Sequence, residues 1–142
     1  IKGLSMKFPI AIELGNETQA YGVEFPDIPG CVSAGDTLDE AIANAYEALE
    51  GYMEFLFEEG DPVPQAGRIE EHRKNPAYTD RIWALVDFDI TPYLGKSQKI
   101  NVTLPDRLIK RIDAIVSANP RYGSRSGFLA QAALDELNSL HS

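Results

Sequence analysis

Large apolar side chains alternate with small or polar ones in the first part of the chain, a pattern typical of β-strands. This alternation predicts strands over residues 7–13, 20–25 and 31–34, and two prolines lie between the second and third of these strands. Residues 81–90 predict a fourth strand, and the continuous apolar run over residues 82–86 suits a strand buried on both faces. The apolar pattern therefore indicates a small β-sheet built mainly from the N-terminal part of the chain.

A long helix is predicted between the third and fourth of these strands. Thr37 and Glu40 have the spacing of a capping box, and apolar residues then recur with the helical period. Gly60 and Pro62 are typical of a helix C-terminus, so we expect the helix to end near Glu59. A short helix is expected around residues 69–74. Together these elements predict an α+β unit over residues 6–93, in which a three- to four-stranded sheet packs on one long helix. Residues 1–5 match no pattern further along the chain, and we assign them no role.

The C-terminal part of the chain predicts a second unit over residues 97–140, with the order strand, helix, helix. Residues 99–104 alternate with a period of two, and Pro105 suits the start of the helix that follows. Asn119 and Pro120 end that helix, and Ser124–Ser126 cap the next one. A single strand with two helices cannot complete a sheet, so we expect two copies to pair their strands into an antiparallel ribbon.

Charge differs sharply between the two units. The formal net charge of −9 argues against a nucleic-acid-binding protein when the chain is taken whole. Residues 1–95 carry 18 acidic and six basic side chains, a net charge of −12, whereas residues 96–142 carry four acidic and seven basic ones, a net charge of +3. The exclusion of nucleic acid therefore applies only to the first unit.

The polar face of the predicted ribbon carries side chains that suit contacts with DNA bases. Lys99 can donate to guanine, Asn101 can pair with adenine, and Thr103 can contact a thymine methyl group. A paired ribbon of this kind fits the major groove. Ser124, Arg125 and Ser126 lie at a helix start, where free amides and a cation suit a phosphate. The alternative is a plain dimerisation module with a solvated polar face.

Four glutamates are expected on one face of the long helix. Glu47, Glu50, Glu54 and Glu58 follow one another at steps of three and four residues. Like charges at this spacing cost helix stability, which suggests a cationic partner. An acidic face that is merely solvated is an equally good interpretation.

The residue types that usually carry chemistry are sparse. Cys31 is the single cysteine, which excludes an internal disulfide and a cysteine-based zinc site. His72 and His141 are expected on the surface, and no short motif brings several carboxylates together as a metal-dependent nuclease requires. We therefore predict no enzymatic activity, no metal and no cofactor. The apolar content of 44% argues against disorder, and no apolar run is long enough to span a membrane, so we expect a cytoplasmic protein without a membrane partner.

Two stretches of the chain resemble known families. Residues 99–134, with INVTLP, LIKRIDAIV and SRSGFLAQAAL, resemble the ribbon-helix-helix domains of bacterial transcriptional regulators. The acidic unit resembles the N-terminal domain of HicB antitoxins in Tyr21–Val23, Phe25–Cys31, Gly35–Ala41 and Trp83–Val86. The two matches together cover nearly all of the chain from Met6 to Asn138.

This resemblance implies an antitoxin of a type II toxin–antitoxin system. HicB-like proteins bind HicA, a small basic toxin that cuts messenger RNA, through an N-terminal domain that is similar to a truncated ribonuclease H fold. Their C-terminal domain dimerises and represses the promoter of the operon. Some members end in a helix-turn-helix, from which this sequence departs.

We therefore expect the acidic unit to attract and cover a HicA-like toxin through the four glutamates. Closer apolar contact is expected from Phe25, Pro26, Asp27, Ile28, Pro29, Gly30 and Cys31. The C-terminal unit is expected to bind operator DNA as a homodimer, and the sequence leaves open whether dimers assemble further. The alternative is a stand-alone ribbon-helix-helix repressor whose N-terminal domain binds a small effector.

Overall fold

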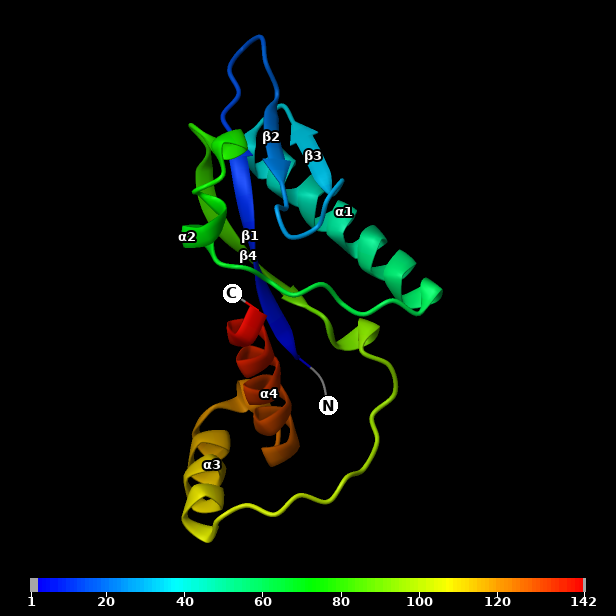
Figure 1. Ribbon diagram of the computed structural model, residues 1–142, viewed down its shortest axis with the longest axis vertical. Coiled ribbons are helices and arrows are strands. Elements are labelled where there is room, and N and C mark those ends of the chain that lie inside the picture. Colours follow the sequence, from blue (N-terminus) through cyan, green and yellow to red (C-terminus); the bar gives the residue numbers. More distant parts are fainter. Residues whose placement is uncertain (1–2, 142) are drawn as a thin grey trace.

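The computed structural model describes residues 3–141 of the chain, which form four strands, four α-helices and three short 3₁₀ helices. Figure 1 shows the sheet and the longest helix at one end of the molecule, and the two C-terminal helices at the other. The elements are β1 (Ser5–Glu13), β2 (Tyr21–Glu24), β3 (Val32–Gly35), α1 (Leu38–Glu59), α2 (Ile69–His72), η1 (Pro76–Tyr78), β4 (Ile82–Asp89), η2 (Thr91–Tyr93), α3 (Asp106–Ala118), η3 (Pro120–Tyr122) and α4 (Arg125–His141).

The four strands form one antiparallel sheet with the order β3-β2-β1-β4. The central strand β1 directs Met6, Phe8, Ile10 and Ile12 toward one face, and these side chains are at most 4% exposed. They belong to one core with Ala41, Ala45, Leu49 and Met53 of α1. The predicted α+β arrangement of a sheet on one long helix is thus confirmed.

The ends of α1 lie where the sequence predicts them. The hydroxyl of Thr37 accepts a hydrogen bond from the Glu40 amide at 3.1 Å. At the other end Gly60 adopts a left-handed conformation with φ of 77°, and its amide donates to the carbonyls of Leu56 and Phe57. Both caps are local in sequence, which is why the pattern alone locates this helix.

The prediction that the last strand is buried on both faces is wrong. In β4 only Val86 and Phe88 are buried, whereas Ile82 and Leu85 are 48% and 51% exposed. The reason is the place of β4 at the edge of the sheet, which leaves one side of the strand without a neighbour among the described residues.

The N-terminal residues have a structural role that the sequence did not reveal. Leu4 is buried in the core, and its carbonyl accepts a hydrogen bond from the amide of Ile90 at 2.8 Å. Ser5 begins β1, and its backbone amide and carbonyl bond to the side chain of Gln131 in α4, at 3.0 and 2.9 Å. This buried glutamine ties the C-terminal unit to the sheet. Ile1 and Lys2 lie outside the described residues.

The C-terminal unit contains the two predicted helices, α3 and α4, but residues 99–104 form no strand within the single chain. Figure 1 shows the chain from η2 to α3 as a long arc. Ile100 and Val102, which the alternation assigns to an apolar face, are 77% and 60% exposed. A strand requires a hydrogen-bonded neighbour, and no described segment of this chain lies alongside these residues to provide one.

No helix among the described residues is both long enough and apolar enough to cross a membrane.

Candidate functional site

The four glutamates of α1 lie on the side of the helix that faces away from the sheet. All four side chains are exposed, whereas the buried positions of the same helix are Ala41, Ala45, Leu49 and Met53. With 3.6 residues per turn, the glutamates fall about opposite these core residues. The helix therefore exposes four carboxylates to water, and no ion pair among the described residues includes any of them.

Two tyrosines and two aspartates border this acidic face, and the sequence did not predict them as part of the site. Tyr46 and Tyr93 both pack against Phe88, with ring centroids 5.2 and 6.0 Å from that of Phe88. Burial raises the pKa of Tyr93, and the charges of Glu54 and Glu50 raise it further. Burial also raises the pKa of Tyr46, followed by the charges of Glu50, Asp89 and Asp87. The negative field thus extends from α1 to β4.

The Phe25–Cys31 segment is mainly a core element, which corrects its predicted role in apolar contact with a partner. Phe25 and Ile28 are 1% exposed and Cys31 is 4% exposed. The amide of Phe25 donates to the carbonyl of Cys31 at 3.1 Å, so the segment closes on itself. Only Pro29 and Gly30 are exposed, while Pro26 and Asp27 are partly buried. Burial raises the pKa of the Cys31 thiol, which opposes a nucleophilic role.

Asp27 has a partner that the sequence did not indicate. Its Oδ1 atom lies 2.8 Å from Nε2 of His72, and the two side chains are 6% and 22% exposed. His72 stacks on Trp83 of β4, with an interplanar angle of 10°. His72 is thus partly buried and paired, which corrects the expectation of a simple surface residue. The pair holds α2 against the sheet. The side chain of His141 lies outside the described residues.

Tyr78 lies beside this pair and makes a testable contribution to stability. Burial raises its pKa to about 12 from an ordinary value of 10.0, and a hydrogen bond to Glu24 adds to this effect. Above pH 10 the unfolded chain loses this proton while the folded chain keeps it, so the free energy of unfolding should fall between about pH 10 and pH 12. Urea unfolding at about pH 9 and about pH 11 should show a smaller fall for Tyr78→Phe than for the unmodified chain. An equal fall in both proteins would contradict this assignment.

The candidate base-contacting residues Lys99, Asn101 and Thr103 are all exposed on the arc that precedes α3. The apolar side chains between them are exposed as well, and so are Leu108 and Ile115 of α3 and Leu137 and Leu140 of α4. Polar and apolar side chains alternate along residues 99–103, so this segment has one polar side and one apolar side. Residues 99–103 are thus free to contact another molecule.

Ser124, Arg125 and Ser126 meet at the start of α4, as predicted, and all three are exposed. The Ser124 hydroxyl accepts a hydrogen bond from the Gly127 amide at 3.0 Å and so caps the helix. Arg125 is not free for a phosphate within the single chain, because it makes a two-point contact with Asp113 of α3 at 2.8 and 3.0 Å. This hydrogen bond to Arg125 lowers the pKa of Asp113. At Gly127 a Cβ atom would collide with the carbonyl oxygen of Tyr122, so the turn requires glycine.

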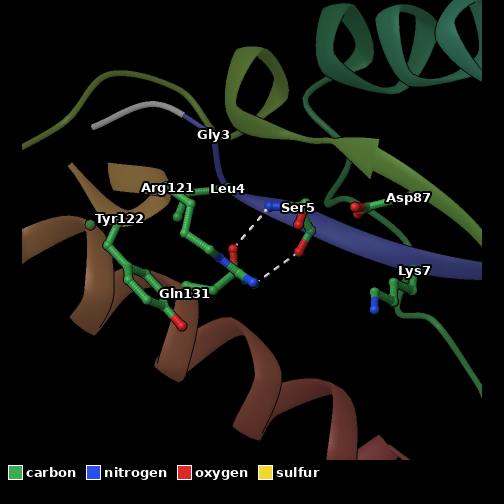
Figure 2. Close-up of a pocket in the computed structure, with 9 residues that line it drawn as sticks. Gly3, Leu4, Ser5, Lys7, Asp87, Arg121, Tyr122 and Gln131 are labelled. Atoms are coloured by element: carbon green, nitrogen blue, oxygen red, sulfur yellow. Dashed lines mark hydrogen bonds between the residues drawn. The ribbon is translucent and has the colours of Figure 1, made fainter. Parts of the chain in front are cut away.

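A polar pocket of about 360 Å³ lies where the C-terminal unit meets β1. Figure 2 shows the hydrogen bonds between Gln131 and Ser5, and Lys7, Asp87 and Arg121 also line the pocket. The pocket combines two cations with a carboxylate, so its charge favours no single class of ligand. Among residues 3–141 the structure shows no group of three or more histidines, cysteines or acidic side chains arranged to hold a metal.

Comparison with known proteins decides the family. The family model described as "HicB_like antitoxin of bacterial toxin-antitoxin system" matches residues 8–133, which is most of the chain. The chain belongs to the HicB-like antitoxin family. The antitoxin HicB 1 of Photorhabdus laumondii is 38% identical to this chain over 65 residues, covering 46% of this chain and 41% of its own. The comparison confirms the resemblance of the acidic unit to HicB antitoxins, and the similar proteins named as antitoxins are not described as enzymes.

Two further relatives match the HicB-like chain over nearly its whole length. A 14.9 kDa protein from the rep-hol intergenic region of Haemophilus phage HP1 is 44% identical over 134 residues, covering 94% of this chain and 99% of its own. The crystal structure of the Burkholderia pseudomallei antitoxin HicB is 43% identical, with a TM-score of 0.70 and coverage of 94% of this chain and 99% of the other. The family match therefore extends over both units and not only the acidic one.

Proposed function

We propose that this HicB-like antitoxin binds and inhibits a HicA-like mRNA-cleaving toxin through its acidic unit. The observation that carries this proposal is the solvent-facing side of α1, where four carboxylates lie opposite the buried side of the helix and form no ion pair with any described residue. A toxin that binds RNA must present positive charge, and a row of carboxylates imitates the charge of the phosphate backbone. Such charge complementarity accelerates encounter and sets specificity.

We propose in addition that the C-terminal unit dimerises and binds operator DNA, so that the antitoxin represses its own operon. The support is the exposed apolar side of residues 99–104 and of α3 and α4, which a second copy would cover. Pairing of two such segments would complete the ribbon predicted from the alternation and present Lys99, Asn101 and Thr103 on its outer side. Arg125 would have to exchange Asp113 for a phosphate when DNA binds.

Co-expression with the product of the short reading frame adjacent to its gene tests the antitoxin proposal. We expect the full chain to relieve the growth arrest caused by that product and to co-purify with it. A stand-alone repressor would instead bind its promoter fragment and leave the arrest unchanged. Failure both to relieve toxicity and to co-purify would rule out the antitoxin proposal for this pair.

A further inference from the structure

The outer edge of β4 is a strand edge without a neighbour among the described residues. The sheet order ends at β4, and only β1 pairs with it. β4 spans eight residues, and two of its large apolar side chains, Ile82 and Leu85, are 48% and 51% exposed. Long apolar edges are normally covered or blocked because they pair readily with other strands. This edge therefore calls for a partner or a block.

The hydrogen bonds to β1 determine which backbone groups of β4 point outward. The Ile90 amide donates to the Leu4 carbonyl, so Leu4 and Ile90 form a hydrogen-bonded pair. Such pairs alternate along an antiparallel ladder, so Phe88, Val86 and Ala84 also bond toward β1. The amides and carbonyls of Trp83, Leu85, Asp87 and Asp89 are consequently directed to the open edge.

We infer that β4 pairs in antiparallel fashion with β4 of a second copy of this chain, with Leu85 opposite Leu85 on the two-fold axis. This register brings the outward-bonding residues of the two strands opposite one another. Trp83 of one copy then lies across from Asp87 of the other, and residue 81 across from residue 89. A two-fold contact of this kind is self-complementary and closed, so it ends at two copies.

The charges of the strand fit this register. Arg81 lies directly opposite Asp89 of the second copy, while its own cross-strand contact with Glu13 remains at 3.9 Å. The two aspartates of the strand, Asp87 and Asp89, never face a like charge. A shift of two residues one way places Leu85 opposite Asp87. A shift the other way gives a shorter ladder, because Phe88 would then face Asp80, whose φ of 66° cannot continue a strand. Charge and backbone geometry therefore both favour the register centred on Leu85.

The apolar side chains of β4 are also paired by this register. On the outer side of the sheet the two exposed Leu85 side chains meet, next to Pro9 of β1 in each copy. On the side facing α1, the exposed Ile82 of one copy lies across from Phe88 of the other. Every large apolar residue of β4 that is exposed in the single chain thus gains an apolar neighbour.

The favoured occupant is a second copy of this chain, because the matching groups are reciprocal within one strand. A toxin strand would have to supply its own cation for Asp89 and its own apolar side chain for Leu85. The contact uses the acidic unit, so it is separate from the proposed C-terminal dimer. A chain with both contacts would assemble beyond a dimer, which the sequence left open.

Cysteine cross-linking tests the register in the full chain. In Leu85→Cys the two thiols should lie on the axis, with Cα atoms about 5.5 Å apart, within the range of a disulfide. The matched control is Asp87→Cys, because residue 87 is exposed on the same strand. In the proposed register, residue 87 of one copy should lie about 14 Å along the ladder from residue 87 of the other. Mild oxidation should give a covalent dimer of Leu85→Cys only, since the native Cys31 is buried. No cross-link from Leu85→Cys, or an equal yield from Asp87→Cys, would overturn the inference.

The native mass gives a second, independent measurement. Leu85→Asp places two like charges opposite each other, so light scattering should show half the mass of the unmodified protein. Val32→Asp is the control, since Val32 is 56% exposed on β3 at the other edge of the sheet, and it should leave the mass unchanged. If Leu85→Asp kept the mass but lost toxin binding, the edge would serve the toxin and the second-copy proposal would be wrong.

Discussion

Replacing Lys99, Asn101 and Thr103 together by alanine should abolish sequence-specific binding of the promoter fragment that precedes the gene. The three side chains share one side of the alternating segment and are exposed in the single chain. A well-oriented pair between a side chain and a base contributes about 1–3 kcal/mol of discrimination, so loss of all three should weaken specific binding at least about a hundredfold. Weak binding to any DNA should persist, because the other cations of the C-terminal unit remain.

A matched control lies immediately before this segment. Lys96→Ala, Ser97→Ala and Gln98→Ala together remove the same number of polar side chains and the same positive charge, but from residues outside the predicted ribbon. Gel-shift titrations with the promoter fragment and with a scrambled fragment should separate the two triple variants. The triple variant at Lys99, Asn101 and Thr103 must still dimerise for this comparison. If it kept its affinity for the promoter fragment and its preference over the scrambled one, base contact by this segment would be refuted.

The parts of the fold that are determined by neighbouring residues could be predicted from the sequence. The limits of α1 follow from Thr37 and Gly60, which act within one turn of the helix. The capping role of Ser124 follows in the same way. In each case the cause lies within a few residues of the effect, so a pattern in the sequence contains it.

Features that depend on distant residues were missed. Nothing near Ile82 or Leu85 indicates that β4 lies at an edge, since this depends on which strands pair with β1. The contact between Asp27 and His72 joins residues 45 positions apart, and the burial of Phe25 and Ile28 depends on a core formed by distant elements. Ser5 gains its role through Gln131 of α4, at the far end of the chain, and Leu4 through Ile90.

The ribbon residues are a different case, because the partner that would order them is not in the same chain. The alternation over residues 99–104 predicts a strand, yet a single chain leaves it exposed and unpaired among the described residues. The sequence pattern therefore gives information about an assembly that the fold of one copy does not display. The acidic face resembles this case, since its repelling charges become favourable only beside a cationic molecule.

Replacing Glu47, Glu50, Glu54 and Glu58 by glutamine should slow association with the toxin by about 10- to 1,000-fold at low salt. The four side chains are exposed and contribute to the negative field that also acts on Tyr46 and Tyr93. Because glutamine keeps the helix propensity and removes repulsion between successive turns, thermal stability should not fall. The dissociation rate should change less, since exposed charges act mainly on encounter.

The control must remove as much charge from other places on the same unit. Glu17→Gln, Asp61→Asn, Glu70→Gln and Asp80→Asn together change the net charge equally, and all four residues are exposed and lie outside α1. Stopped-flow association measured over a series of salt concentrations should show a steep salt dependence for the control and a shallow one for the variant on α1. If both variants associated equally fast at every salt concentration, net charge alone would attract the toxin. A slower association rate in the α1 variant alone would instead mean that the four carboxylates on the exposed side of α1 guide the toxin.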